Sequence, residues 1–269
     1  MKTTSVRLIP LAEFENQKLR DVKETRSVAE YCWTCTAPLI EYVMQRETEA
    51  ASVAYLDADL FFFSDPRPIY EEFEKGSILI IGHRYSPEYQ AWEKTSGIYN
   101  VSMIIFRNDS SGIECLRWWK DQCMTACVLD PDAGYCGDQK YLDDWPARFR
   151  DVIVLRHKGG GLAPWNIAKY SLKKREGRTF VDEEPLIFYH FHSLQIIARR
   201  LFFRRLFAAS KGYRFNKRQR ALIYDPYAES IHRAIIAVEQ ASPGFAWGYT
   251  GASWLDVLEV WRSGNLVKN

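Results

Sequence analysis

A short apolar run followed by two carboxylates constrains this chain more than any other stretch. The run covers Val53 to Leu56, and Asp57 and Asp59 follow it in the sequence VAYLDADLFFFSDP. An apolar run of this length, bounded by polar residues, predicts a buried strand with both carboxylates at its carboxyl end. Ligands of open α/β sheets bind beyond the carboxyl ends of strands. Because neighbouring carboxylates repel one another, the pair indicates a site for a divalent cation that also holds phosphates.

Predicted strands alternate with predicted helices as far as residue 193. We expect strands at 6–9, 53–56, 77–82, 100–106, 152–155 and 185–192. We expect helices at 18–44, 69–75, 111–127 and 138–145, and a loop at 85–96. Ser111 and Glu114 have the spacing of a capping box at the start of the third helix. The alternation predicts the α/β class.

The character of the sequence changes at Leu194. From there to Arg220, basic residues, several of them in pairs, alternate with Leu and Phe. The pattern predicts a basic amphipathic helix, which fits contact with an anionic membrane surface as well as an ordinary helix with a solvated basic face. Two further helices are expected at 225–269. We therefore expect a catalytic domain at 1–193 and a basic helical extension at 194–269.

Composition argues against several functions. A net charge of +2 implies no general attraction to nucleic acid. No run of about 18 apolar residues predicts a membrane span, and the first residues lack the apolar core of a signal peptide. Six cysteines without such a signal predict reduced thiols in the cytosol. Cys32 and Cys35 are expected to be buried thiols rather than a redox pair or half a zinc site.

Five segments together resemble a known family. The stretch YLDADLFFFSDP resembles the DxD motif of GT-A fold glycosyltransferases, especially the glycogenin-like family 8 and its bacterial relatives. YNVSMIIFRND, GDQKYLDDW, APWN and HFHS follow in the family's order, and resemble its Asn-x-Gly strand, Asp-Gln segment, aromatic-Asn turn and metal-binding His segment. The resemblance covers about residues 1–195. It implies a mixed sheet between helices and a metal-dependent transferase that moves a sugar from a nucleotide diphosphate sugar, expected to be UDP-linked, to a glycan or lipid-linked acceptor.

The resemblance assigns the metal to Asp57, Asp59 and His190. A Mn²⁺ or Mg²⁺ ion there would act as a Lewis acid on the diphosphate as the nucleotide leaves. Asp57 is open to two roles, because it suits the ribose hydroxyls or a second metal position as well. His190 and His192 lie two apart on a predicted strand and so face one side. An imidazole beside carboxylates favours Mn²⁺.

Asp138 and Gln139 match the family's acceptor-side pair near the anomeric carbon of the donor. An Asp there holds a sugar hydroxyl or stabilises an oxocarbenium-like centre, and capping of the following helix is the structural alternative. The resemblance also implies substrate contacts by Asn100, Ser102, Trp165 and Asn166. We add Arg26, which precedes the first long helical stretch, and His192, which stands where the family has an apolar residue. In this set Arg26 is expected to face the diphosphate, and the two Asn residues to bind sugar hydroxyls.

The chain departs from the family in two places. Ser102 stands where Gly is usual, which narrows the sugar pocket. The carboxylate pair also comes at residue 57, whereas the family has a complete strand-helix-strand unit before the segment that begins here. We therefore expect a domain without its first βαβ unit, an open edge at 53–56, and weak activity of the chain alone.

Two other functions fit the same carboxylates. A phosphatase of the haloacid dehalogenase type also carries D-x-D after an apolar strand, with the first Asp, here Asp57, as a phosphorylated nucleophile. Phe61 stands where that family usually has Thr. The other alternative is a degenerate transferase that binds sugar or nucleotide without catalysis.

Overall fold

The chain forms two compact units. The computed structural model describes residues 6–198, 207–210, 212–245 and 267–268. The first unit contains the described residues of Met1–Asp57, Glu71–His83 and Ala91–Leu155, and the second those of Ala58–Tyr70, Arg84–Gln90 and Arg156–Asn269. The boundary expected at residue 194 therefore does not coincide with the division between these units.

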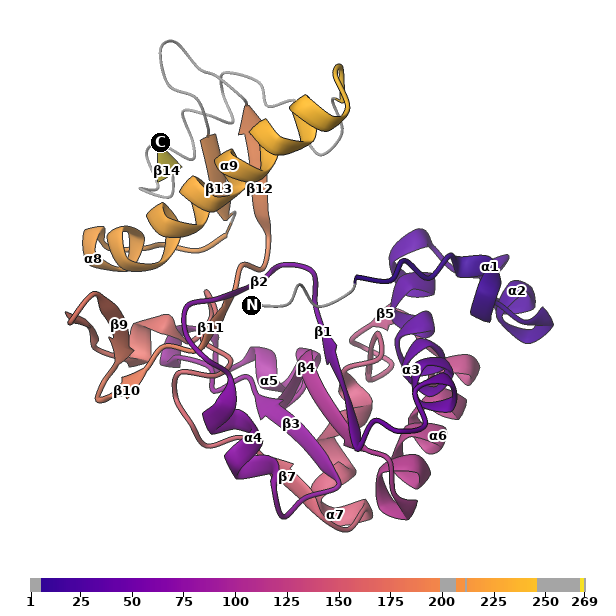
Figure 1. Cartoon of the computed structure of the whole chain (residues 1–269). Coiled ribbons are helices and arrows are strands. Elements are labelled where there is room, and N and C mark those ends of the chain that lie inside the picture. Colours follow the sequence, from indigo (N-terminus) through magenta and orange to yellow (C-terminus); the bar gives the residue numbers. More distant parts are fainter. Residues whose placement is uncertain (1–5, 199–206, 211, 246–266, 269) are drawn as a thin grey trace. The chain divides into compact units, whose positions relative to one another are not determined.

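A four-stranded mixed sheet in the order β1-β4-β3-β7 forms the centre of the first unit (Figure 1). Its strands are β1 (Ser52–Leu56), β3 (Ile78–Gly82), β4 (Tyr99–Arg107) and β7 (Val152–Val154). β4 pairs antiparallel with β1 and β3, whereas β7 runs parallel to β3. β3 is buried throughout and β4 everywhere except at its ends, as expected for central strands. Among the described residues β1 pairs with β4 alone, so it has the open edge expected there.

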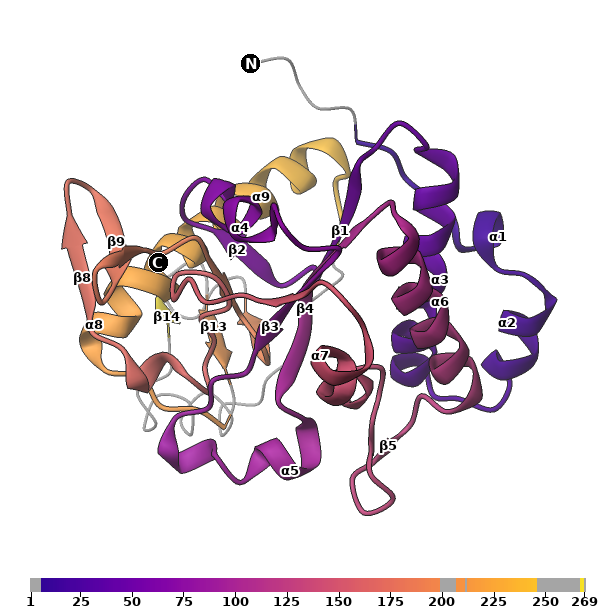
Figure 2. The same cartoon turned by 90° about the horizontal axis from the view of Figure 1, so that it is seen from below.

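Two long helices, α3 (Val28–Arg46) and α6 (Ser110–Thr125), lie side by side in both views (Figures 1 and 2). Their apolar side chains share one core with the sheet and with α7 (Trp145–Arg148). Trp119 and Trp145 are fully buried in this core, with their rings edge to face at 5.5 Å. The structure thus confirms the predicted α/β class with a mixed sheet and helices.

The chain before β1 differs from the prediction. Residues 6–9 form no strand, and Val6 and Leu8 are 89% and 85% exposed. The single helix expected at 18–44 is two helices, α2 (Gln17–Lys23) and α3, preceded by α1 (Leu11–Phe14). The break has a local cause, because the Ser27 and Glu30 side chains form a capping box that starts α3.

Short elements complete the first unit. The loop expected at 85–96 contains the 3-10 turn η1 (Pro87–Tyr89), which belongs to the second unit, and helix α5 (Trp92–Ser96), which belongs to the first. β5 (Leu129–Asp130) and β6 (Tyr135–Cys136) form a small hairpin, and η2 (Lys140–Asp144) leads into α7.

The second unit consists mainly of short antiparallel strands. They are β2 (Leu60–Phe62), β8 (Leu172–Arg175), β9 (Arg178–Val181), β10 (Glu184–Pro185), β11 (Phe188–His190), β12 (Leu194–Ala198), β13 (Phe207–Ser210) and β14 (Val267–Lys268). Its helical elements are η3 (Ile167–Lys169), α8 (Lys217–Gln219), the π-turn η4 (Arg220–Tyr224) and α9 (Asp225–Ala241), and α4 (Arg67–Phe73) follows β2. β2 pairs with β11, and an aromatic core that includes Tyr189, Phe191 and Tyr224 holds α9.

The helix expected at 194–220 is wrong in the part of the chain that the structure describes. Residues 194–198 and 207–210 form the antiparallel strands β12 and β13, and only Lys217–Gln219 begins a helix. The basic residues in 199–206 and at 211 lie outside the described residues. One of the two helices expected after residue 225 is α9, and the other falls largely on 246–266, also outside them. No helix in the described ranges combines the length and apolar character needed to cross a bilayer.

The start of α6 gives a test of local stability. The predicted box at Ser111 is not used, because Asp109 caps the helix by accepting the Gly112 N–H at 2.9 Å and also accepts the Ser77 hydroxyl at 2.7 Å. We expect Asp109→Ala to lower the free energy of unfolding by about 1–2 kcal/mol. The free energy of unfolding of Ser111→Ala, measured in urea titrations, should stay within about 0.5 kcal/mol of the wild-type value. A larger loss in Ser111→Ala than in Asp109→Ala would contradict the cap.

Candidate functional site

The carboxyl end of β1 fixes the position of Asp57. The last pair of the β1–β4 ladder joins Leu56 to Met103, and the Asp57 N–H continues it by donating to the Ser102 carbonyl at 2.8 Å. Tyr55 lies two residues earlier, so its side chain is on the same face of the strand. Its hydroxyl donates to Asp57 Oδ1 at 2.8 Å. One carboxylate oxygen of Asp57 is thereby held by the strand that carries it.

Pairing of β2 with β11 brings Asp59 to His190 in the second unit. The ladder places His190 opposite Leu60, and the Phe191 N–H donates to the Asp59 carbonyl at 2.9 Å. Asp59 Oδ1 then lies 3.0 Å from His190 Nε2. The Asp59 side chain is 44% exposed, whereas that of His190 is only 6% exposed. A buried imidazole therefore supports a carboxylate that reaches solvent.

Asp57 is tied to this pair by the chain itself, since only Ala58 separates it from Asp59. One ligand atom each from Asp57, Asp59 and His190 lie within 4.8 Å of one another. Ligands about 2.1 Å from a metal ion lie about 3–4 Å apart, so small side-chain rotations would suffice to hold one. Two carboxylates with one imidazole suit Mn²⁺ and Mg²⁺. The structure thus brings together the three residues predicted as metal ligands.

Electrostatics keep Asp59 ionised. Burial disfavours the carboxylate, but the hydrogen bond with His190 and the charges of His190 and His192 outweigh it, so that the pKa of Asp59 lies below its usual value. Burial and the neighbouring His190 lower the pKa of His192. Near neutral pH His192 is therefore an uncharged imidazole, able to accept a hydrogen bond or a metal.

Trp165 lies edge-on to both histidines. Its ring centroid is 5.3 Å from that of His190 and 5.5 Å from that of His192. Asn166, next to it, is fully buried, and its amide donates to the Gly161 carbonyl and accepts from the Ala163 N–H. Asn166 therefore helps to build this loop, and its contact with a sugar stays a prediction.

The triple-glycine loop at 159–161 is closely packed. The Gly159 carbonyl accepts the Ile187 N–H at 2.8 Å, and the Arg84 guanidinium donates to the Gly160 carbonyl. A Cβ on Gly159 would lie 1.9 Å from the Pro185 carbonyl oxygen, so this approach requires glycine.

The residues predicted on the sugar side form a linked polar cluster in the first unit. Asn100 donates to Gln139 Oε1 at 2.9 Å and accepts the Ser102 N–H at 3.0 Å. Gln139 in turn donates to the Ser96 carbonyl at 2.7 Å. His83, which sequence reasoning missed, places its Nε2 3.4 Å from the Asn100 amide nitrogen. No motif indicated His83, because it lies after β3 in an otherwise ordinary turn.

Asp138 is a buried carboxyl group with a perturbed pKa. Burial raises its pKa to about 7, while a hydrogen bond with Thr36 opposes the rise and the charge of Asp57 adds to it. Its backbone carbonyl accepts the Trp119 indole N–H at 2.9 Å. The short helix η2 begins without a side-chain cap, so Asp138 does not have the capping role that was the structural alternative. Perturbed buried carboxyl groups of this kind are typical of functional sites.

Arg26 has a structural role that differs from the prediction. Its guanidinium donates to the Cys123 and Met124 carbonyls at 2.7 and 3.0 Å, and to the Thr34 hydroxyl. These carbonyls lie in the last turn of α6, where a cation is favourable. Arg26 therefore holds α3 against α6, and we leave it out of the proposed donor site.

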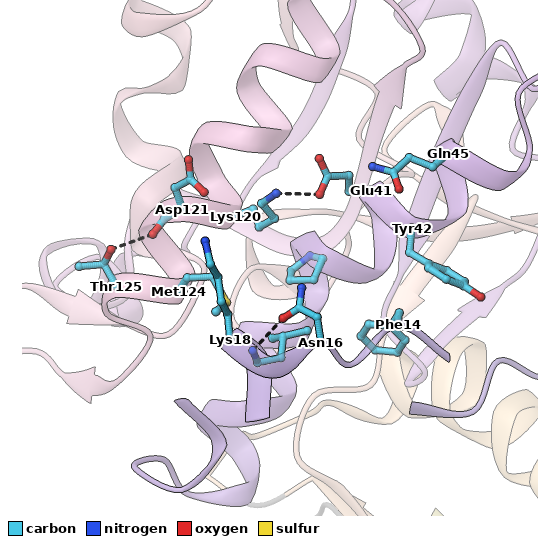
Figure 3. A pocket seen from close by; sticks show the side chains of 12 residues that line it. Phe14, Asn16, Lys18, Glu41, Tyr42, Gln45, Lys120, Asp121, Met124 and Thr125 are labelled. Carbon is cyan, nitrogen blue, oxygen red and sulfur yellow. Dashed lines mark hydrogen bonds and ion pairs between the residues drawn. The ribbon is translucent and has the colours of Figure 1, made fainter. Parts of the chain in front are cut away.

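A separate pocket of about 580 Å³ lies in the first unit between α1, α2, α3 and α6 (Figure 3). Part of its lining is the ion pair of Lys120 and Glu41, in which Nζ lies 2.7 Å from Oε2. Asn16, which caps α2, also lines it. Phe14, Tyr42 and Gln45 line another part. None of the residues predicted for the site lines this pocket, so we do not assign the chemistry to it.

The burial of Asp138 predicts a pH-dependent stability. Its pKa is about 7 in the folded protein and about 3.9 in an unfolded chain, so the folded state binds more protons between these values. The free energy of unfolding should therefore fall as pH rises through this window and level off above it. Between about pH 5 and 8, we expect the free energy of unfolding of the wild type to fall by about 2–3 kcal/mol more than that of Asp138→Asn, as measured in urea titrations. The control Asp121→Asn, at an exposed carboxylate, should follow the wild type, and parallel curves for wild type and Asp138→Asn would contradict the assignment.

Comparison with known proteins finds proteins that are similar in structure and in sequence. No protein-family model matches it. A crystal structure of mouse xyloside xylosyltransferase 1 in its apo form is similar at 12% identity over 68% of this chain and 73% of that chain, with a TM-score of 0.40. At that level the likeness carries no argument about function.

Two proteins of Bacillus subtilis are much closer in sequence. YfnD, an uncharacterized protein, is 32% identical over 247 residues, which are 91% of this chain and 78% of YfnD. YfnF, also an uncharacterized protein, is 35% identical over 205 residues, which are 74% of this chain and 68% of YfnF. The chain therefore belongs to the family of YfnD and YfnF.

Proposed function

We propose that this protein is a metal-dependent glycosyltransferase that moves a sugar from a nucleotide diphosphate sugar, with UDP as the expected nucleotide, to a glycan or lipid-linked acceptor. The cluster of Asp57, Asp59 and His190 is the observation that carries the proposal. Its donor atoms suit a hard divalent cation, and such a cation suits a diphosphate. The order of the five sequence motifs supports the same reaction.

Mn²⁺ or Mg²⁺ would be held by Asp59 and His190, with Asp57 completing the set. The ion would supply Lewis-acid stabilisation of the diphosphate leaving group. His190 keeps Asp59 ionised over the physiological pH range, so the carboxylate is ready to bind a cation without first losing a proton. Tyr55 donates to Oδ1 of Asp57 and so orients the carboxylate that would bind the ion or ribose hydroxyls.

The sugar would be bound by the cluster of Asn100, Ser102 and Gln139, with Asp138 beside it. Amide groups fixed by one another present donors and acceptors with little freedom left to lose, which suits the recognition of hydroxyl groups. Trp165 and His192 belong to the second unit, where their ring centroids lie 5.5 Å apart, and their substrate contacts stay separate predictions. Contact with a membrane through 194–220 rested on the predicted helix and is not part of this proposal.

The phosphatase alternative is less well supported. Phe61 stands where that family usually has Thr. A degenerate transferase without catalysis would have the same metal site. Only a measurement of turnover distinguishes it from the active enzyme.

Metal and nucleotide binding give the first test. In thermal-shift measurements with nucleoside diphosphates and their sugars, we expect Mn²⁺ and a UDP-sugar together to raise Tm by several degrees, because ligands of the native state stabilise it. Asp59→Asn and His190→Ala should abolish the Mn²⁺-dependent part of the Tm shift, whereas the control His232→Ala on α9 should retain it. A Mn²⁺-dependent shift that persists in both site variants would remove the basis of the proposal. Release of UDP from the sugar identifies a transferase, and hydrolysis of a generic phosphomonoester a phosphatase.

Gln139→Ala tests the sugar side. Because Gln139 belongs to the sugar cluster and not to the metal cluster, we expect kcat to fall about ten- to a hundredfold while the affinity for UDP and Mn²⁺ stays within about twofold. Gln122→Ala on α6 is the matched control and should leave both unchanged. A large loss of UDP affinity with unchanged kcat would contradict the assignment.

A further inference from the structure

Two backbone groups fix the orientation of both amide side chains in the sugar-side cluster. An amide group can turn over and exchange its oxygen and nitrogen unless its partners accept only one arrangement. The Ser102 N–H is a donor, and it donates to Asn100 Oδ1 at 3.0 Å. The Ser96 carbonyl is an acceptor, and Gln139 Nε2 donates to it at 2.7 Å. The nitrogen of Asn100 and the oxygen of Gln139 are therefore the atoms that face one another.

This orientation determines which nitrogen of the His83 ring carries a proton. Asn100 Nδ2 donates to Gln139 Oε1 at 2.9 Å, and the same nitrogen lies 3.4 Å from His83 Nε2. An amide nitrogen carries two hydrogens and accepts no hydrogen bond, so His83 Nε2 has to be the acceptor. The proton of the neutral ring then lies on Nδ1. A charged ring, or the other tautomer, would set one N–H against another.

The sheet holds His83 in this position. His83 directly follows β3, and its N–H donates to the Ile98 carbonyl at 2.8 Å, which extends the β3–β4 ladder beyond the pair of Gly82 and Tyr99. Only 3% of His83 is exposed. Burial of a polar ring costs free energy unless its polar atoms have partners, and an apolar residue would avoid this cost. The contact with Asn100 gives the ring a role that packing alone does not.

The cluster has a buried end and an accessible end. Asn100 is 7% exposed and lies with His83 at the buried end, whereas Gln139 is half-buried. Gln139 Nε2 carries a second hydrogen besides the one that it donates to Ser96, and this hydrogen would meet a sugar oxygen. Gln139 is thus the member that a substrate reaches, and Asn100 and His83 support it from behind.

We propose that His83 is a positioning residue for the sugar side, which acts as an uncharged imidazole protonated on Nδ1 and holds Asn100, and through it Gln139, in one orientation. The inference rests on the proposed function, since it takes Gln139 as a sugar contact. The 3.4 Å contact is long for a hydrogen bond, so His83 selects an orientation and adds little binding energy of its own. A group that is already oriented favours the reactive arrangement of the substrate.

NMR of the full chain with nitrogen-labelled histidine tests the tautomer without any substrate. The two nitrogens of a neutral imidazole give different signals, because one carries a hydrogen and the other does not. The chain has five histidines, and the signals that disappear in His83→Gln are those of His83. Near neutral pH we expect a proton on Nδ1 and none on Nε2. A proton on Nε2, in the other tautomer or in a charged ring, would overturn the proposal.

Two substitutions separate the acceptor from the ring. His83→Phe keeps a ring and removes the acceptor, whereas the side-chain oxygen of His83→Gln replaces Nε2 as an acceptor. In His83→Phe we expect kcat for UDP release from a UDP-sugar to fall about three- to tenfold, while the affinity for UDP and Mn²⁺ stays within about twofold. His83→Gln should recover most of kcat, and the control His232→Phe on α9 should match the wild type. Equal losses of kcat in His83→Phe and His83→Gln would overturn the positioning role.

The inference and the proposed function fail differently. The side-chain amide signals of Asn100 and Gln139 need no substrate, and they should shift in His83→Phe but not in His232→Phe. If they shift and the wild type turns over no nucleotide sugar, the hydrogen-bonded cluster stands and the proposed function is wrong. If the wild type is active and His83→Phe matches it in both signals and kcat, the positioning role alone is wrong. If His83→Phe did not fold, the tautomer in the wild type would decide.

Discussion

Negative charge at the end of β1 is the constraint on which the proposed chemistry depends. Asp57 adds to the cost of ionising the buried Asp138, and the chain places Asp59 only two residues further on. The structure balances part of this charge with hydrogen bonds, from Tyr55 to Asp57 and between Asp59 and His190. Bonds of this kind orient carboxylates without neutralising them. A divalent cation is the simplest group that would both orient the carboxylates and neutralise their charge. The grouping of these residues therefore argues for a metal more strongly than any one of them alone.

The sequence predicted the parts of the fold that follow from local pattern. Apolar runs located β1, β3 and β4, although β1 is an edge strand that is only half-buried and not the buried strand predicted. The carboxylates located the loop after β1. The break before α3 was missed because a capping box at Ser27 lay within a region of continuous helical character. The segment after Leu194 was taken for a helix because its basic pairs recur at about helical spacing. Its β-branched and aromatic residues suit strands equally well, and pairing of β12 with β13 decided between them.

The candidate site was predictable where chemistry and chain order coincide. His190, Asn100 and Gln139 were predicted because HFHS, YNVSMIIFRND and GDQKYLDDW follow in the family's order. Tyr55 had a usable signal, since alternation along a strand puts it on the same face as Asp57. Thr36 and His83 had none, because their positions depend on how α3 and the turn after β3 are placed. Arg26 and Asn166 differ from these, because their polar groups form hydrogen bonds within the fold and their substrate contacts stay predictions.

The buried carboxyl group of Asp138 lowers the stability of the fold, and this cost bears on its proposed role. A carboxyl group at this depth is destabilised whenever it ionises, and its pKa of about 7 means that it does so near neutral pH. Asn would make similar hydrogen bonds without that cost, and no helix cap depends on the charge. Trp119 fixes the backbone of Asp138 by donating its indole N–H to the Asp138 carbonyl. A buried carboxyl group that lowers stability when it ionises supports the proposed place of Asp138 beside the sugar.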